Sequence, residues 1–391
     1  MSFAFGHPAL AIPGPSATPD RVLRAMHRAA TDIYAGELVQ VNARVVAALK
    51  RLAGTTGDVA PYIGNGHAGW EAATTNLLNR GDRALVLVNG MFGAGWAAHA
   101  RALGIEVEEL TSPHGQPADP AALASRLADD RDHRIRAVLC TQVDTATSVR
   151  NDLPALRAAM GDHPAAFAVD AIASLGCEPL RMDDWGIDLL VSASQKGLMA
   201  PPGLAFVWIG PRLKGGTDLV TPYWDWRPRV AAQALWQYWG GTPPVQHIYG
   251  MDQALRMLLD DEGLDAAHAR HHGLAQAVWA AFDCWSAGHP GLALTVADPA
   301  ARAWSVTAAS IPGATGLRDW ATRHMGTTLG LGLGAPDPDN ALRIGHMGHL
   351  SAQSLLGTLA VVETAMTALN IPHGPGALTA ATARLAGLAG A

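Results

Sequence analysis

Lysine is nearly absent from this sequence of 391 residues. Of its 28 basic residues only three are lysines, at positions 50, 196 and 214, and the others are arginines. Arginine therefore supplies almost all of the positive charge, which excludes a general role of lysine as a surface cation. A retained lysine therefore favours a chemical role, because an amine can lose its proton and condense with a carbonyl group, whereas a guanidinium cannot.

Cysteine is equally scarce. Cys140, Cys177 and Cys284 are odd in number and have no CxxC or metal-site spacing, which argues against a disulfide-stabilised scaffold and a cysteine-based metal site. The N-terminal sequence MSFAFGHPALAIPGPS lacks the basic start and continuous apolar core of a secretory signal. No apolar run is long enough to span a bilayer. We therefore expect a cytoplasmic protein with no membrane association.

Basic clusters interleaved with aromatic residues are also missing. The net charge is −6 and the basic residues are scattered, which offers no electrostatic footprint for nucleic acid or an anionic membrane. With 49% hydrophobic and 16% charged residues, the chain has the composition of a well-packed globular protein of roughly two domains. We expect small-molecule partners and no nucleic acid.

Apolar strand-like runs alternate with helical segments over the first two thirds of the chain. Continuous apolar strands between helices predict an α/β fold with a mainly parallel sheet, covered by helices on both faces. The predicted strands are residues 84–90, 105–110, 136–142, 165–171 and 188–194, and the predicted helices include 69–79, 94–103 and 121–130.

The pattern changes after about residue 250. A long helical stretch is followed by short strand-like segments, by a GLGLGAP run (330–336) that predicts a turn, and by a final helix at about 351–369. This mixture predicts a smaller C-terminal α+β domain. We predict an N-terminal arm at 1–17, which could also join the small domain, a large domain at 18–262 and the small domain at 263–391.

Two ionisable residues follow neighbouring predicted strands. Ligands of open parallel sheets bind beyond the carboxyl ends of the strands, where Asp170 and Lys196 both fall. A buried carboxylate needs a cationic partner, and a protonated pyridine nitrogen is one. We infer that Lys196 holds pyridoxal 5′-phosphate (PLP) as an imine, while Asp170 keeps the ring nitrogen protonated. A solvated lysine, and an aspartate that caps a helix or pairs with an arginine, remain the alternatives.

The phosphate of such a cofactor needs backbone donors at the start of a helix. The segment GNGHAG (64–69) opens into a helix expected to begin near Trp70, and its glycines let successive amides converge on an anion. Ser194 and Gln195, beside the lysine, could add contacts to the phosphate or the ring. The same segment is equally consistent with a turn and a helix cap.

Four segments together resemble the class V aminotransferases, in the serine:glyoxylate and alanine:glyoxylate branch. The resemblance is collinear from about Pro13 to about Thr367, and it implies PLP-dependent transferase fold type I. It also implies ping-pong transamination between a small amino acid (serine, alanine or aspartate type) and glyoxylate or pyruvate, in a homodimer with shared active sites. The segments are VDAIASLG (169–176), LRMDDWGIDLLVS (180–192), SASQKGLMAPPGLAFV (192–207) and LRIGHMGHL (342–350).

The resemblance also implies a role for individual residues. Lys196 and Asp170 take the catalytic roles given above, and Arg343 holds the substrate carboxylate with its two-pronged guanidinium. It implies that Phe92 stacks on the cofactor ring with Ile172 on the opposite face, and that Thr145 lies near the 3-oxygen. On the phosphate side it implies contacts from Asn65, Gly66, His67 and Gln195. It also implies that Trp239 and Thr242 of YWGGTPP (238–244) reach the cofactor site of the neighbouring subunit.

Three departures from the family pattern concern the substrate. The segment ATDIYAGELVQ (30–40) lacks the arginine that relatives carry near the active-site entrance. Asp144 and Ser148 stand where Glu and Gly are common, and His67 replaces a Thr of the plant-type members. The amino donor is therefore open, and an unusual amine donor is an alternative.

Three other patterns have rival interpretations. Gly90, Gly93 and Gly95 follow a strand as in a dinucleotide site, but their order is GxxGxG and not GxGxxG. HARHH (268–272) has helical metal-ligand spacing, but nothing completes a ligand set, so we predict no metal and a solvated or interface face. A PLP-dependent lyase or desulfurase on the same fold is the closest rival. A desulfurase needs a reactive cysteine on a mobile loop, and the cysteines here are predicted in helix or beside strands.

Overall fold

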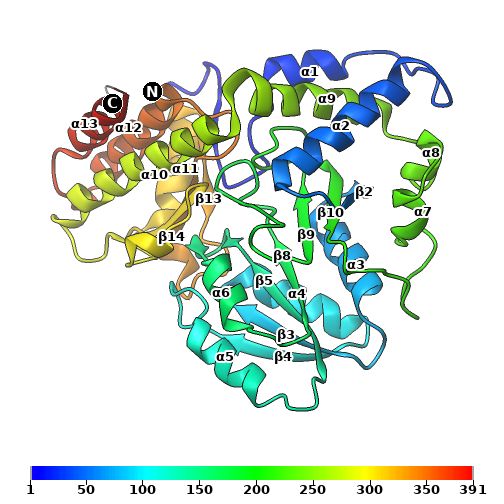
Figure 1. Ribbon diagram of the computed structural model, residues 1–391. Helices are drawn as coiled ribbons and strands as arrows, with labels where there is room; N and C mark the ends of the chain where they lie inside the picture. Colours follow the sequence, from blue (N-terminus) through cyan, green and yellow to red (C-terminus); the bar gives the residue numbers. More distant parts are fainter. Residues whose placement is uncertain (1, 390–391) are drawn as a thin grey trace.

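The computed structural model describes residues 2–389, which form two sheets flanked by helices (Figure 1). In the larger, seven-stranded sheet β10 alone runs in the direction opposite to the other six strands, so the predicted mainly parallel sheet is confirmed. Its strands, in spatial order, are β2 (Asp58–Gly64), β10 (Gly203–Ile209), β9 (Leu189–Ala193), β8 (Ala166–Asp170), β5 (Ile135–Thr141), β3 (Arg83–Val88) and β4 (Glu106–Thr111).

Helices cover both faces of this sheet, because alternate strand residues point to opposite sides. In β3, Leu85 and Leu87 belong to one apolar cluster and Val86 to another. The first cluster includes residues of α2 (Glu37–Ala53), α5 (Pro120–Ala128), α6 (Leu153–Ala159) and α9 (Val245–Arg256), and the second those of α3 (Gly66–Leu77) and α4 (Met91–Ala102).

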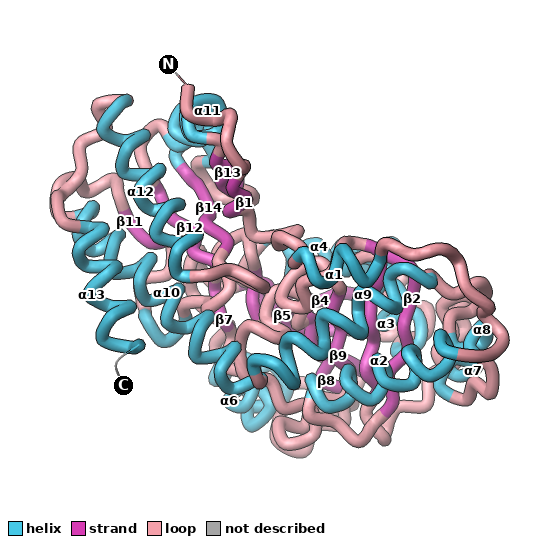
Figure 2. The backbone as a smooth tube through the Cα atoms, turned by 90° about the horizontal axis from the view of Figure 1, so that it is seen from above, coloured by secondary structure: helices cyan, strands magenta, loops and turns pink. Residues whose placement is uncertain are grey.

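A second, five-stranded sheet forms a separate lobe (Figure 2). Its first strand comes from the N-terminal arm and pairs in parallel with β13, so the arm does join the small domain. In spatial order the strands are β1 (Ala9–Ala11), β13 (Thr327–Leu331), β14 (Ala341–Gly345), β12 (Val306–Ser310) and β11 (Ala293–Leu294). The helices are α10 (Leu264–Ser286), α11 (Ala314–Met325), α12 (Ala352–Ala368) and α13 (Ala377–Ala389).

Short elements complete the chain. The boundary that we propose near residue 262 falls where a π-helical turn, Met257–Glu262, ends before Gly263 and α10. The ends of the proposed domain ranges, residues 1 and 390–391, lie outside the described residues. The remaining elements are α1 (Asp20–Met26), α7 (Arg227–Val230), α8 (Leu235–Tyr238) and the hairpin of β6 (Val143–Asp144) and β7 (Val149–Arg150).

Two local expectations differ from the structure. The predicted turn at 330–336 is wrong at its start, because Gly330 and Leu331 belong to β13 and pair with β14. Strand β2 has no clear sequence signal because Pro61 interrupts it, but β2 lies at the edge of the sheet, where a strand tolerates proline.

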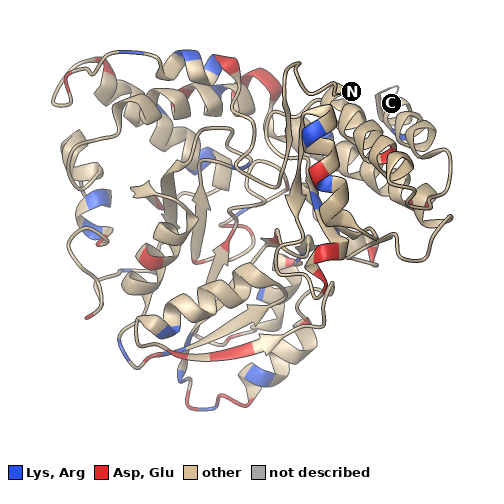
Figure 3. Ribbon diagram, turned by 180° about the vertical axis from the view of Figure 1, so that it is seen from behind, with Lys and Arg blue, Asp and Glu red and all other residues tan. Residues whose placement is uncertain are grey.

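Charged residues of both signs are dispersed over the two lobes (Figure 3). This distribution agrees with the scattered charges of the sequence. Within residues 2–389, no helix combines the length and the apolar character needed to cross a membrane.

Arg229 holds the segment between β10 and α9 against the large sheet. The residue is 1% exposed, and its guanidinium lies 4.2 Å from the ring centre of Tyr62. It donates hydrogen bonds to the carbonyl oxygens of Pro61 (2.9 Å), Tyr223 (2.6 Å) and Tyr238 (3.3 Å). One buried side chain therefore satisfies three carbonyl groups, one in β2 and two in the segment between β10 and α9.

Replacing Arg229 by methionine should lower the free energy of unfolding by about 3 kcal/mol, because buried carbonyl oxygens lose their donors. Urea denaturation of the apoprotein measures this loss. The matched control is Arg227→Met, since Arg227 is exposed and, among residues 2–389, its guanidinium pairs with Asp225 alone. Equal losses for the two variants would contradict the assignment.

Candidate active site

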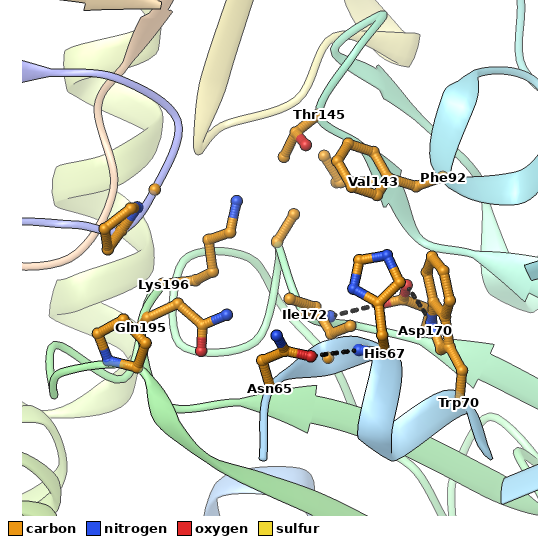
Figure 4. Close-up of a pocket in the computed structure, with 15 residues that line it drawn as sticks. Asn65, His67, Trp70, Phe92, Val143, Thr145, Asp170, Ile172, Gln195 and Lys196 are labelled. Carbon is orange, nitrogen blue, oxygen red and sulfur yellow. Dashed lines mark hydrogen bonds between the residues drawn. The ribbon is translucent and has the colours of Figure 1, made fainter. Parts of the chain in front are cut away.

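A cavity of about 280 Å³ lies at the carboxyl ends of the parallel strands (Figure 4). This volume is close to the lower end of the range for small-molecule sites, about 300–1,000 Å³. The position agrees with the strand-end rule for open sheets. Most of the predicted residues line it, namely Asn65, Gly66, His67, Phe92, Thr145, Asp170, Ile172, Gln195 and Lys196.

Lys196 follows β9, and its amine points into the cavity (Figure 4). Its Nζ donates a hydrogen bond to the carbonyl oxygen of Pro13 in the N-terminal arm. Gly14 packs on the lysine side chain, since a Cβ at this position would lie 2.5–2.7 Å from its outer atoms. Burial, with a further contribution from Arg343, lowers the pKa of Lys196 to about 8. About a tenth of the amine is therefore neutral at pH 7, and able to attack a carbonyl carbon, far more than for an ordinary lysine.

Asp170 ends β8, the strand next to β9. Its carboxylate accepts hydrogen bonds from the indole Nε1 of Trp70 (2.9 Å) and from the backbone N–H of Ile172 (2.7 Å). Burial raises the pKa of Asp170 to about 7, although these two donors oppose the shift. A cation in the cavity would stabilise the ionised form of this carboxyl group.

The start of α3 forms one end of the cavity. Asn65 caps the helix, because its side chain accepts a hydrogen bond from the N–H of His67 (3.1 Å). The helix begins at Gly66, earlier than the sequence indicates, and a Cβ on Gly66 would lie 2.4 Å from Cδ1 of Ile172. Glycine thus lets the helix start approach Ile172, and the free N–H groups of the first turn favour an anion there.

Gln195 offers a further polar group on the wall of the cavity. Its Oε1 is buried and has no hydrogen-bond partner among residues 2–389. Buried polar groups in folded proteins are normally paired, so an unpaired one beside a cavity indicates a ligand contact. Figure 4 places Gln195 and Asn65 at the same end of the cavity, where they could together contact one anionic group.

Phe92 and Thr145 lie together at the opposite end (Figure 4). Phe92 belongs to the first turn of α4, and Thr145 follows β6 and is 3% exposed. Ile172 lies between them and the start of α3 in this view. An aromatic ring and an aliphatic side chain on different walls are suitable for enclosing a planar ligand.

Arg343 lies on β14, outside the cavity lining. It is 8% exposed, and it donates hydrogen bonds to the carbonyl oxygens of Leu331 (2.7 Å) and Thr145 (2.9 Å). Burial lowers its pKa to about 10, and the nearby Asp144 opposes the shift. Its Nη2 has no acceptor within residues 2–389, which leaves the two N–H groups of this nitrogen for a carboxylate.

Trp239 and Thr242 do not reach the cavity of their own chain. Trp239 is 1% exposed and its indole donates to Asn42 (2.9 Å), whereas Thr242 lies exposed just before α9. Their predicted contact with a neighbouring subunit stays a prediction. The sequence reasoning in turn missed Trp70, although its position three residues after His67, on one face of a helix, could have indicated it.

The model of the family described as Aminotransferase class-V matches residues 10–313. The chain belongs to the class V aminotransferases. It is therefore a PLP-dependent aminotransferase of fold type I, as the resemblance of the motifs implies.

Two curated relatives and one solved structure give the similarity in numbers. The chain is 34% identical to the L-aspartate–glyoxylate aminotransferase of Paracoccus denitrificans (strain Pd 1222), over 86% of this chain and 85% of the relative. It is 32% identical to the serine–glyoxylate aminotransferase of Arabidopsis thaliana, over 87% and 85%. The crystal structure of pyridoxamine-pyruvate aminotransferase from Mesorhizobium loti has a TM-score of 0.90 and 26% identity, with 99% of this chain and 100% of that chain covered.

The cavity of this aminotransferase has the groups that PLP needs. A buried amine could bind the cofactor's carbonyl carbon, a buried carboxyl group could pair with a cationic ring nitrogen, and the start of α3 with Gln195 could bind the phosphate. The close approach of Gly66 supports this fit, and so does the amide group of Gln195, whose Oε1 has no partner among residues 2–389 and whose Nε2 can donate to a phosphate oxygen.

Two rival interpretations fail in the structure. The glycine pattern at 90–95 cannot bind a dinucleotide phosphate, because the N–H groups of Phe92 and Gly93 already bond to Asp144. The solvated or interface face predicted for HARHH is wrong for His271, which is fully buried between the carbonyl oxygen of Ala267 and the N–H of Gly348. Within residues 2–389, no three His, Cys, Asp or Glu side chains gather as a metal site would require.

Replacing Asp170 by asparagine should change how the stability of the apoprotein depends on pH. Because folding raises the pKa of Asp170 from 3.8 to about 7, the folded state holds an additional proton in that window. The free energy of unfolding of the wild type therefore falls as pH rises through it. The variant has no such proton, so it should gain stability relative to the wild type between pH 4 and 7 in urea denaturation. A difference between the two proteins that does not change with pH would contradict the raised pKa.

Proposed function

We propose that this enzyme catalyses ping-pong transamination between a small amino acid, of the serine, alanine or aspartate type, and glyoxylate or pyruvate. The observation that carries the proposal is the pair of buried groups at adjacent strand ends, the amine of Lys196 with a lowered pKa and the carboxyl group of Asp170 with a raised one. The aspartate–glyoxylate, serine–glyoxylate and pyridoxamine–pyruvate enzymes to which the chain is similar support these substrate classes.

PLP, when bound, supplies an electron sink for the charge that develops on the α-carbon of the amino acid. Lys196 would hold the cofactor through its carbonyl carbon, and the same amine, once free, would move the proton of the substrate's α-carbon. Asp170 would keep a proton on the ring nitrogen. Phe92 and Ile172 would enclose the ring, and Thr145 would lie near the 3-oxygen.

The phosphate and the substrate carboxylate bind at different places. The start of α3, with Asn65, Gly66, His67 and Gln195, would bind the phosphate in the favourable field of the helix N-terminus. Arg343 would hold the substrate carboxylate through the N–H groups of its Nη2, and its hydrogen bond to the carbonyl oxygen of Thr145 fixes its direction.

We further propose a homodimer in which each subunit completes the other's site. Three large apolar side chains are exposed next to site residues, namely Ile63 (45%), Met91 (47%) and Leu331 (61%). Ile63 precedes the phosphate-binding segment, Met91 adjoins Phe92, and Leu331 pairs with the strand that carries Arg343. A second copy that covered them could bring Thr242, with Trp239 behind it, to the phosphate.

The cysteines argue against a desulfurase. Cys140 and Cys177 are buried, and burial raises the pKa of Cys177 to about 12, so that its thiol stays protonated. Cys284 lies within α10 and not on a loop. None of these positions provides the reactive thiolate on a mobile segment that desulfurase chemistry needs.

A screen of single half-reactions tests the proposed function and identifies the donor. Holoenzyme is mixed with one amino compound at a time, without an oxo acid, and the absorbance of the bound cofactor and the product are followed. We expect one oxo acid per cofactor and then no further reaction until glyoxylate or pyruvate is added. Repeated release of pyruvate or sulfide without an acceptor would show a lyase, and a response to pyridoxamine alone would show an unusual amine donor.

Replacing Lys196 by alanine should remove the visible absorbance of the bound cofactor and lower turnover by about 10³-fold or more, because both the attachment point and the proton-transfer group are lost. The matched control is Lys50→Ala, since Lys50 pairs with Asp58 at the surface. Retention of the absorbance and turnover in the Lys196 variant would refute the assignment.

Replacing Arg343 by alanine should raise KM for the amino acid by about tenfold or more, because a charge-assisted hydrogen bond to the substrate carboxylate is lost. The dissociation constant of the cofactor should change far less. Arg318→Ala is the control, since Arg318 also donates to a carbonyl group of β14, that of Ala341, but unlike Arg343 it forms no hydrogen bond with a cavity-lining residue among residues 2–389. Equal losses in amino-acid and cofactor binding would argue against this role.

A further inference from the structure

Asp144 is a fully buried carboxylate to which the proposed mechanism gives no role. It lies between Val143 and Thr145, both of which line the cavity. Its Oδ2 accepts hydrogen bonds from the N–H groups of Phe92 (2.7 Å) and Gly93 (3.1 Å), and its Oδ1 accepts one from the N–H of Ala146 (2.9 Å). A single side chain thus connects the first turn of α4 to the loop that carries Thr145.

The start of α4 has no cap of its own. The N-cap position is Gly90, which has no side chain to accept a hydrogen bond. A Cβ on Gly90 would lie 2.3–2.5 Å from the carboxylate atoms of Asp144. The backbone at Gly90 is extended (φ 178°), so glycine is required here for space and not for conformation. Asp144 therefore takes the place of the missing cap, from a segment more than fifty residues away in the sequence.

The charge of Asp144 also acts on the neighbouring ionisable groups. It raises the pKa of Arg343, and it contributes in the same direction to the pKa values of Lys196 and Asp170. Burial raises the pKa of Asp144 itself, although its backbone donors oppose the shift. The carboxylate is thus coupled to the site by charge as well as by backbone hydrogen bonds.

We propose that Asp144 is a positioning residue of this active site, which holds Phe92 and Thr145 in place across the cavity from Lys196. It does so through backbone N–H groups on both sides and touches no cavity space itself. The inference rests on the proposed cofactor site, because the purpose of the fixed pair is to enclose the PLP ring.

Two substitutions test the inference from opposite sides of the contact. Asp144→Ala removes the carboxylate, and Gly90→Ala displaces it without changing its chemistry. Each variant should weaken PLP binding to the apoprotein by about tenfold or more, as a cofactor titration followed by fluorescence measures. Each should also speed hydrogen–deuterium exchange in peptides that cover residues 89–95. The double variant should bind PLP no more weakly than Asp144→Ala, because the alanine at 90 then has no carboxylate to displace.

Matched controls separate positioning from stability. Asp130→Ala removes a buried carboxylate that accepts the N–H groups of Arg134 and Ile135 at the other end of the sheet. Gly95→Ala adds a methyl group within α4 at an ordinary contact distance of 3.4 Å from Trp70. Both controls should keep the wild-type dissociation constant for PLP, even where thermal unfolding shows a loss of stability.

Wild-type PLP affinity and wild-type exchange at 89–95 in the Asp144 and Gly90 variants would overturn the inference, whatever their melting temperatures. If Asp144→Ala does not fold, Gly90→Ala and its exchange rates decide. If the wild type itself fails to bind PLP, the proposed function is overturned instead. Exchange at 89–95 in the apoprotein then still decides whether Asp144 caps α4.

Discussion

Burial of two opposite charges at adjacent strand ends is the constraint on which this site depends. Lys196 and Asp170 form no hydrogen bond with one another. The amine donates to the carbonyl oxygen of Pro13, and the carboxyl group accepts from Trp70 and Ile172. Loss of hydration therefore moves the two pKa values toward each other, to about 8 and about 7. A ligand with a carbonyl carbon for the amine and a cationic nitrogen for the carboxylate relieves both costs, and PLP has both groups.

The rest of the fold maintains this arrangement. The parallel strands β8 and β9 bring Asp170 and Lys196 to the carboxyl ends of the parallel strands. The N-terminal arm reaches the same place after pairing with β13 in the small domain. Glycine permits the closest approaches, at Gly14 against the lysine and at Gly66 against Ile172. Arg343 extends from the small domain to the carbonyl oxygen of Thr145, so a hydrogen bond joins the two domains beside the cavity.

Features with a local signal could be predicted from the sequence, and features that depend on distant packing could not. The continuous apolar strands and the residues at their ends indicated the sheet, Lys196 and Asp170, and the motifs indicated the family, which the comparisons confirm. The hydrogen bond of Trp70 to Asp170 and the cap that Asp144 provides for α4 join segments 100 and 52 residues apart. Helical spacing alone also did not indicate that His271 is buried. One of its hydrogen-bond partners, the carbonyl oxygen of Ala267, lies one turn earlier in the same helix, but the other, the N–H of Gly348, lies in the loop after β14.

Chemical trapping of the cofactor on the chain tests the central claim most directly. The protein is incubated with PLP, reduced with borohydride, digested and analysed by mass spectrometry. Because lysine occurs at only three positions, each possible attachment site gives its own peptide. The account predicts a pyridoxyl phosphate label on Lys196, and on Lys50 and Lys214 no more than the labelling seen with a denatured sample. A native protein labelled mainly on Lys50 or Lys214, or not labelled at all, would contradict it.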